Sequence, residues 1–150
     1  MIKKVYLDAN ILIAHQVSGH EFHERAKKII DNLWSENAFL LISALTMDEF
    51  LYGIVFLLRG EKNDNSFGSF ASILSKTVQA VLSWNTTRLI EFENSEDSLI
   101  NILDSIKTYN LRPRDAFHLE CMKQNKVFAI ATFDNDFNPL SKNEKITVIQ

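Results

Sequence analysis

The feature that most constrains the fold is the alternation of β-rich apolar segments with segments of helical periodicity along the whole chain. Strands are expected at 4–9, 38–43, 87–92 and 127–131, with a weaker one at 145–150. Helices are expected between them, at 10–16, 20–34, 45–58, 69–83, 96–108 and 113–124. Because strands that are separated by helices usually pair in parallel, this order predicts an α/β fold. The polar stretch 60–68 is the longest expected loop, and we expect it to be mobile.

A chain of 150 residues with an apolar fraction of 46% can bury one sizeable core, so we expect a single domain over residues 1–150. The net charge is −3 and no basic block is present, which argues against tight nonspecific binding to long duplexes. Cys121 is the single cysteine, so an intrachain disulfide and a cysteine-rich zinc site are excluded. We expect Cys121 to be a small buried residue and the chain to reside in the cytoplasm.

Two apolar runs resemble membrane or export signals. The run 38–58 is nearly long enough to span a bilayer, but Asp48 and Glu49 lie at its centre. Each would cost about 2.5–3.5 kcal/mol at mid-membrane, so a buried helix is expected and no membrane partner. The N-terminal segment begins like a signal peptide, but Asp8 interrupts its apolar stretch and no small-residue cleavage site follows.

Four acidic residues are candidates for a site at the carboxyl ends of the parallel strands, where such sheets bind their ligands. Asp8 ends the first strand, Glu49 lies on an apolar helix face near Gly53, Asp115 opens a helix behind Pro113, and Asp134 follows a later strand. Each has a structural explanation of its own. Asp8 can occupy a turn or cap a helix, and Glu49 can form a salt bridge. The charge of Asp115 is favourable at the N-terminus of its helix because of the helix dipole. Asp134 and Asp136 suit an Asx turn, and Asp48 is expected to be solvated.

Taken together, these carboxylates favour a metal site. Crowded carboxylates repel one another unless a divalent cation neutralises them, and Mg²⁺ or Mn²⁺ prefers oxygen ligands. The histidines are a weaker signal for a metal. His118 is interpreted as packed or solvated, and His15, His20 and His23 are interpreted as surface residues without a further ligand nearby.

Four segments resemble the motifs of PIN-domain nucleases, and most nearly those of VapC-type toxins from toxin–antitoxin pairs. The segments are "YLDANILI" (6–13), "SALTMDEFLYG" (43–53), "RPRDAFHLECM" (112–122) and "IATFDNDF" (130–137). The resemblance implies a three-layer α/β/α sandwich around a mainly parallel sheet of about five strands. It also implies Mg²⁺- or Mn²⁺-dependent cleavage of RNA.

The same resemblance implies roles for individual residues. Asp8, Glu49, Asp115 and Asp134 match the acidic quartet, Asp136 matches an additional metal ligand, and Asn10 and Thr132 match supporting polar residues. The "HLECM" segment departs from the small, alanine-rich continuation that is common in the family, so the packing of that helix is expected to differ. Arg112 and Arg114 suit either phosphate oxygens or ion pairs with the acids, and ion pairing is the preferred interpretation.

The sequence therefore predicts an endoribonuclease in which carboxylate-bound metal activates water for in-line attack on phosphorus. The resemblance further suggests a toxin that forms a homodimer and binds an antitoxin whose tail enters the acidic site. One alternative is a non-catalytic PIN-like domain that binds RNA or protein. Another is a phosphotransfer domain with Asp8 as its nucleophile, which is disfavoured because neither Lys142 nor Lys145 follows a suitable strand.

Overall fold

The computed structural model describes residues 3–60, 66–143 and 146–150. Its five strands form one parallel sheet in the order β3-β2-β1-β4-β5. The strands are β1 (Lys4–Leu7), β2 (Phe39–Ser43), β3 (Thr87–Ile90), β4 (Ala129–Ala131) and β5 (Thr147–Ile149). In register, Tyr6 of the central strand β1 lies between Leu41 of β2 and Ile130 of β4. The predicted parallel sheet is therefore confirmed.

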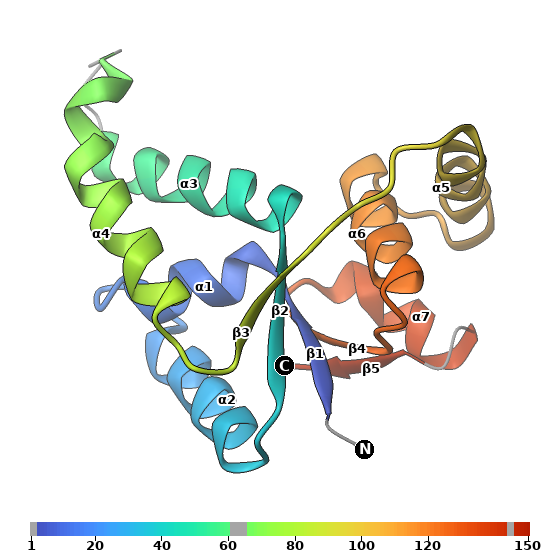
Figure 1. The fold of residues 1–150 in the computed structure, drawn as a ribbon, viewed down its shortest axis with the longest axis horizontal. Helices are drawn as coiled ribbons and strands as arrows, with labels where there is room; N and C mark the ends of the chain where they lie inside the picture. The colour runs from blue at the N-terminus through green and yellow to red at the C-terminus, as the bar shows by residue number, and fades with distance from the viewer. Residues whose placement is uncertain (1–2, 61–65, 144–145) are drawn as a thin grey trace.

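Helices cover both faces of this sheet (Figure 1). One layer contains α1 (Ala9–Gln16), α2 (His23–Ser35), α3 (Ala44–Arg59) and α4 (Ala71–Leu82). The other contains α5 (Glu96–Tyr109), α6 (Pro113–Gln124) and α7 (Asn138–Asn143). Two short 3₁₀ helices, η1 (Phe67–Phe70) and η2 (Asn135–Phe137), precede α4 and α7. The three-layer α/β/α sandwich is the architecture that the sequence predicted.

The two layers have separate cores because side chains of a strand alternate between its faces. Val5 and Leu7 of β1 pack with α1 to α4, whereas Tyr6 between them packs with α5 and α6. Both faces are therefore dry, which explains why the strands read as nearly continuous apolar runs. This alternation also directs Tyr6 toward α6, where it meets a histidine of the candidate site.

Local sequence signals explain several element boundaries. Ser43 caps α3 by accepting a hydrogen bond from the Thr46 amide, and Pro113 occupies the first turn of α6. Gly53 permits α3 to pack closely on α1, because a Cβ there would collide with the Ile13 side chain. This close packing positions α3 beside the strand end that carries Asp8.

Other expectations were wrong in detail. The helix around 45–58 was expected to be buried on most sides, but Tyr52 and Phe56 are 67% and 70% exposed. One face of α3, including Phe50, packs on the sheet, and the opposite face lies outside the sandwich. Helix α2 begins at His23 rather than at residue 20, and helix α7 was not anticipated.

The expected loop at 60–68 is only partly described. Residues 61–65 lie outside the described residues, and η1 begins at Phe67. Within the described ranges, no helix combines the length and hydropathy needed to cross a membrane.

Candidate functional site

Asp8 stands where β1 passes into α1, at the carboxyl edge of the sheet. Its side chain is buried, and its Oδ2 accepts hydrogen bonds from the Thr132 hydroxyl at 2.5 Å and the Asn10 amide at 2.9 Å. The Asp8 backbone N–H donates to the carbonyl of Ala131 on β4 at 3.0 Å. Pairing of the central strands thus brings together residues that are 124 positions apart in the chain.

Thr132 and Asn10 connect Asp8 to the turn that carries Asp134. The Asn10 side-chain oxygen Oδ1 accepts a hydrogen bond from the Phe133 backbone amide at 3.1 Å, and the Thr132 hydroxyl oxygen accepts one from the Asp134 backbone amide at 2.9 Å. Asn10 also donates its side-chain amide to the Thr132 hydroxyl at 3.2 Å. Asn10 and Thr132 are therefore hydrogen-bonded both to the Asp8 carboxylate and to the turn that carries Asp134.

Glu49 projects from α3 toward the same edge of the sheet. Its Oε2 lies 2.9 Å from His118 Nε2, and its Oε1 lies 3.1 Å from Arg114 Nε. Its side chain is 16% exposed, whereas the neighbouring Asp48 is exposed to solvent. The expected solvation of Asp48 is confirmed, and the salt bridge considered as an explanation for Glu49 is present.

The His118 ring is held by a buried hydrogen-bond network. Its Nδ1 lies 2.7 Å from the Tyr6 hydroxyl, which also bonds to Ser43 and Thr46. Burial raises the pKa of Tyr6, so its hydroxyl stays protonated and is able to donate to Nδ1. An ionised Glu49 carboxylate can only accept hydrogen bonds, so His118 Nε2 carries a proton and donates to it.

This contact was missed from the sequence, because His118 was interpreted only as packed or solvated. It is buried, but it is also paired with a site carboxylate. The available signal was its spacing: His118 lies three residues after Asp115, so both occupy one face of α6.

Arg112 holds the remaining acids together. Its Nη2 lies 2.6 Å from an oxygen of Asp134 and 2.6 Å from one of Asp136, and its Nε lies 3.3 Å from Asp115 Oδ2. Asp134 Oδ1 accepts the Asp136 amide at 2.9 Å, so the predicted Asx turn is also present. The preferred interpretation of the arginines, ion pairing with the acids, agrees with these contacts.

The electrostatics of the site are unfavourable for the acids by themselves. Burial raises the pKa of Asp8, and the Glu49 charge adds to this effect. Burial also raises the pKa of Asp115, which the Arg112 guanidinium opposes. Asp115 Oδ2 is buried and accepts no hydrogen bond within the described part of the chain, despite its contact with Arg112. A bound cation would stabilise the ionised forms of both Asp8 and Asp115.

One cleft joins all four acids. It has a volume of about 550 Å³, and its lining includes Asp8, Glu49, Asp115 and Asp134. Potential ligand atoms lie within 4.8 Å of one another in two groups, one of Asp8, Glu49 and His118 and the other of Asp115, Asp134 and Asp136. The cleft is open to solvent, and its four carboxylates supply the oxygen ligands that suit a hard divalent cation that retains several waters.

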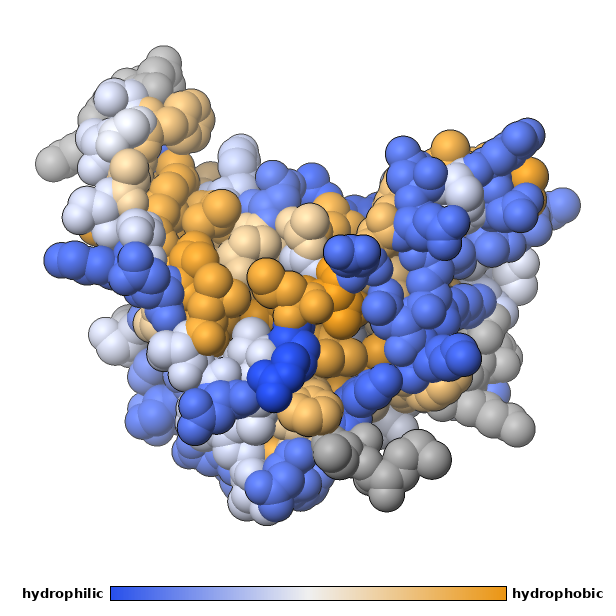
Figure 2. All heavy atoms as spheres, viewed as in Figure 1, coloured by the Kyte–Doolittle hydropathy of each residue, from blue (hydrophilic) through white to orange (hydrophobic). Residues whose placement is uncertain are grey.

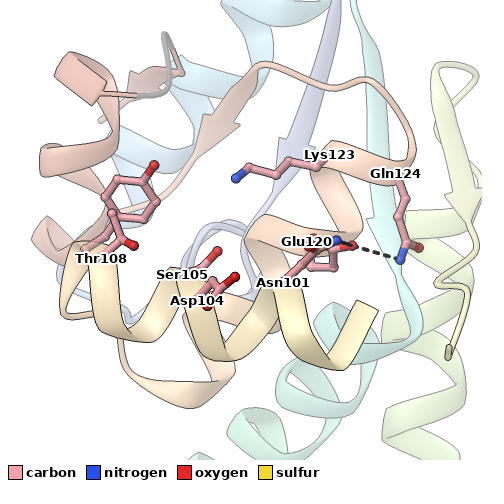
Figure 3. Close-up of a pocket in the computed structure, with 8 residues that line it drawn as sticks. Asn101, Asp104, Ser105, Thr108, Glu120, Lys123 and Gln124 are labelled. Atoms are coloured by element: carbon pink, nitrogen blue, oxygen red, sulfur yellow. Dashed lines mark hydrogen bonds between the residues drawn. The ribbon is translucent and has the colours of Figure 1, made fainter. Parts of the chain in front are cut away.

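A second hollow lies between α5 and α6 (Figure 3). Its buried acid, Glu120, accepts hydrogen bonds from Asn101 at 3.2 Å and Gln124 at 3.3 Å. Lys123 reaches across the hollow and lies 5.9 Å from the centre of the Tyr109 ring. The hydrogen bonds to Glu120 thus come from neutral side-chain amides. No group of metal-ligating residues was found here among the described residues.

The fold and the acidic cleft define an α/β domain with carboxylates gathered at the carboxyl edge of its parallel sheet. The family model of the PIN domain matches residues 5–143. The chain therefore belongs to the PIN domain family.

The chain is similar in sequence to a VapC ribonuclease and in fold to a VapC toxin, as the sequence segments indicated. Ribonuclease VapC2 of Methanocaldococcus jannaschii is 26% identical over 148 residues, which cover 97% of this chain and 94% of that protein. VapC20 of Mycobacterium tuberculosis, a sarcin–ricin loop cleaving toxin, superposes with a TM-score of 0.60 at 17% identity, covering 89% of this chain and 92% of its own. A toxin–antitoxin complex from Klebsiella pneumoniae gives a TM-score of 0.56 at 21% identity, covering 89% of each chain.

Proposed function

We propose that this protein is a Mg²⁺- or Mn²⁺-dependent endoribonuclease that acts as the toxin of a toxin–antitoxin pair. The observation that carries the proposal is the convergence of Asp8, Glu49, Asp115 and Asp134 on one cleft. Membership of the PIN domain family and the relation to a VapC ribonuclease support it. The single, buried cysteine suits the reducing cytoplasm, where the proposed RNA substrate is found.

The carboxylates of the cleft fit a divalent cation on three grounds. The donors are mainly oxygens, the pKa of Asp8 and of Asp115 is raised by burial, and Asp115 Oδ2 accepts no hydrogen bond from the described residues. Asp8, Glu49, Asp115 and Asp134 would hold the ion, with Asp136 as a further ligand. When bound, such an ion activates water and neutralises charge on the phosphate.

The residues around the acids orient them and receive the substrate. Thr132 and Asn10 hold one oxygen of Asp8 in a fixed direction, and His118 does the same for Glu49. Arg112 and Arg114 are 64% and 61% exposed at the rim of the cleft. Their guanidinium groups therefore suit phosphate oxygens of RNA as well as the acids that they contact.

The decisive experiment compares cleavage of total RNA in Mn²⁺ with cleavage in EDTA. We expect discrete cleavage sites in Mn²⁺ and intact RNA in EDTA, with activity restored when excess Mn²⁺ is added back. Cleavage that persists at the same sites in EDTA would contradict the proposal.

The ion pairs of Arg112 favour one competing function. They offset part of the charge of Asp134 and Asp136 without a metal, as in a domain that binds RNA or protein but does not cut. RNA that copurifies with the protein and survives in Mn²⁺ would support this alternative over the nuclease.

We further propose a homodimer, because large apolar side chains remain exposed. They include Tyr52, Phe56 and Leu57 on α3 and Leu99, Ile100 and Leu103 on α5. Figure 2 shows additional apolar surface on the side of α4 that faces the middle of the molecule. Exposed apolar patches of this kind commonly mark interaction surfaces.

Light scattering in solution tests the homodimer directly. We expect a mass twice that of the 17.3 kDa chain, and a shift toward monomer for Phe56→Glu or Leu103→Glu. Phe128→Glu is the matched control, since Phe128 is 58% exposed but directly precedes β4 and belongs to neither α3 nor α5. A monomeric wild-type protein at micromolar concentration would refute the dimer.

The proposed antitoxin is a small protein that covers the acidic cleft. We expect the product of a neighbouring gene, when co-expressed, to copurify with this chain and to block its cleavage of RNA. A complex that retains full nuclease activity would contradict this assignment.

His118 is expected to act as a positioning residue for Glu49. Replacing His118 by Phe removes both ring hydrogen bonds and should lower kcat roughly 10–100-fold, as for other residues that orient metal ligands. His118→Gln keeps an N–H donor near the position of Nε2 and should restore part of the activity. Equal kcat and equal Mn²⁺ dependence in wild type and His118→Phe would exclude this role, provided that both proteins are folded by circular dichroism.

A further inference from the structure

Two phenylalanine rings stack beside the acidic cleft. Phe133 lies between Thr132 and Asp134 in the chain, and its ring centre is 4.9 Å from that of Phe22, with an angle of 36° between the planes. Phe22 immediately precedes α2 and is 36% exposed, and Phe133 is half-buried. We call this pair the aromatic platform.

The platform is fixed relative to the acids. The Phe133 amide donates to Asn10, whose own amide donates to Asp8 Oδ2. On the other side, the Phe22 amide donates to His20 Nδ1 at 3.1 Å. A group stacked on the platform would therefore sit at a defined place beside the cleft.

Positive charge adjoins the platform. The Arg25 guanidinium carbon lies 5.4 Å from the centre of the Phe133 ring. Arg25 also lines a pocket of about 340 Å³ together with Lys3, Lys28 and Glu36. Because Lys3 pairs with Glu36 at 2.6 Å, Arg25 and Lys28 give this pocket a net positive charge. Arg25 thus places a positive charge on the aromatic platform, and Lys28 of the same helix lines the same pocket.

This arrangement matches the chemistry of single-stranded RNA. Unpaired bases stack on aromatic rings and on guanidinium planes, while basic side chains follow the phosphates. A double helix keeps its bases stacked internally and offers no free base face to such a platform. An acidic metal site repels phosphates when no cation is bound, so a basic surface nearby is needed to hold the strand.

We propose that the aromatic platform stacks an unpaired base of a single-stranded RNA substrate, while Arg25 and Lys28 contact its phosphates. This inference rests on the proposed ribonuclease function and adds residues that position its substrate beside the acidic cleft. It assigns substrate positioning to Phe22 and Arg25, which are separate from the metal-ligating acids.

The test measures binding and cleavage separately. Binding of a fluorescein-labelled single-stranded oligouridylate is followed by anisotropy, using Asp8→Asn as the background so that no cleavage occurs. We expect Phe22→Ala to weaken binding about tenfold, in the range known for one stacked base, and Phe22→Trp to restore it. Phe67→Ala is the matched control, because Phe67 is 55% exposed and also lies under an arginine, with Arg59 at 5.3 Å. It should bind as the background does.

The salt dependence distinguishes stacking from phosphate contact. Phe22→Ala should leave the slope of log affinity against log salt unchanged. Arg25→Ala should reduce that slope by about 0.7, the value for one lost phosphate contact on a single strand. In the cleaving protein, Phe22→Ala should raise KM with little change in kcat.

The outcomes separate this inference from the proposed function. If the wild type cleaves RNA but Phe22→Ala leaves both oligouridylate affinity and KM unchanged, the platform proposal is overturned and the nuclease stands. If no RNA is cleaved but binding depends on Phe22 as described, the nuclease fails and the platform stands. If the oligouridylate does not bind, or a blunt duplex binds equally well through Phe22, the platform proposal is also overturned.

Discussion

Asp8→Asn is expected to lower RNA cleavage in Mn²⁺ on the order of a thousandfold while leaving the protein folded. Asparagine keeps the size of the side chain, and its carbonyl oxygen still accepts the hydrogen bonds from Thr132 and Asn10. What it loses is the negative charge that would hold the cation. The measurement is the initial rate of cleavage at mapped sites, for wild type and variant side by side.

The same variant should be more stable than the wild type when no metal is bound. Burial raises the pKa of Asp8 above its ordinary value of 3.8, so the ionised side chain destabilises the folded state. We expect the melting temperature of the variant in EDTA to exceed that of the wild type by a few degrees, since about 1 kcal/mol shifts it by roughly 2–4 °C at this size. Conversely, Mn²⁺ should raise the melting temperature of the wild type but hardly that of the variant.

The pH dependence provides a check on the physical cause. The stability advantage of Asp8→Asn should be full above the raised pKa of Asp8. It should disappear as the pH falls toward 3.8, because protonation removes the buried charge from the wild type as well. An advantage that does not change with pH would show that the carboxylate charge is not its origin, and full cleavage by the variant would refute the metal mechanism.

Glu49→Gln should also abolish most cleavage, by about a hundredfold or more, although Glu49 lies on a helix rather than at a strand end. The glutamine carbonyl can still accept the hydrogen bond from His118 Nε2, but it cannot contribute charge to the cation. The adjacent Asp48→Asn is the matched control, because Asp48 is exposed and does not line the acidic cleft. It should retain nearly full kcat and the wild-type dependence on Mn²⁺.

Two readouts separate loss of charge from loss of structure in the Glu49 variant. Its Mn²⁺ titration should shift to higher concentration, whereas its melting temperature in EDTA should change little. Equal loss of activity in Glu49→Gln and Asp48→Asn would mean that net negative charge on α3, rather than a defined ligand, sustains the reaction.

The sequence predicted the sheet and most helices because their signals are local. Helix α6 has the predicted bounds, since Pro113 sets its first turn, whereas β4 is shorter than its apolar run. Sequence alone placed Asp8 and Asp134 at strand ends, and parallel pairing then made their proximity a geometric consequence. No local sequence signal predicts the contacts between side chains that belong to different layers of the fold.

Residue types and their periodicity along the chain therefore determined the class of fold and the candidates for the acidic cleft. Only the tertiary structure decided that His118 lies beside Glu49 and that Arg112 contacts three aspartates. It also decided that the Phe22 ring packs against the Phe133 ring. The physical reason is the range of the interactions. Helical and strand periodicity act over a few neighbouring residues, whereas these contacts depend on how two helical layers and a sheet edge pack against one another.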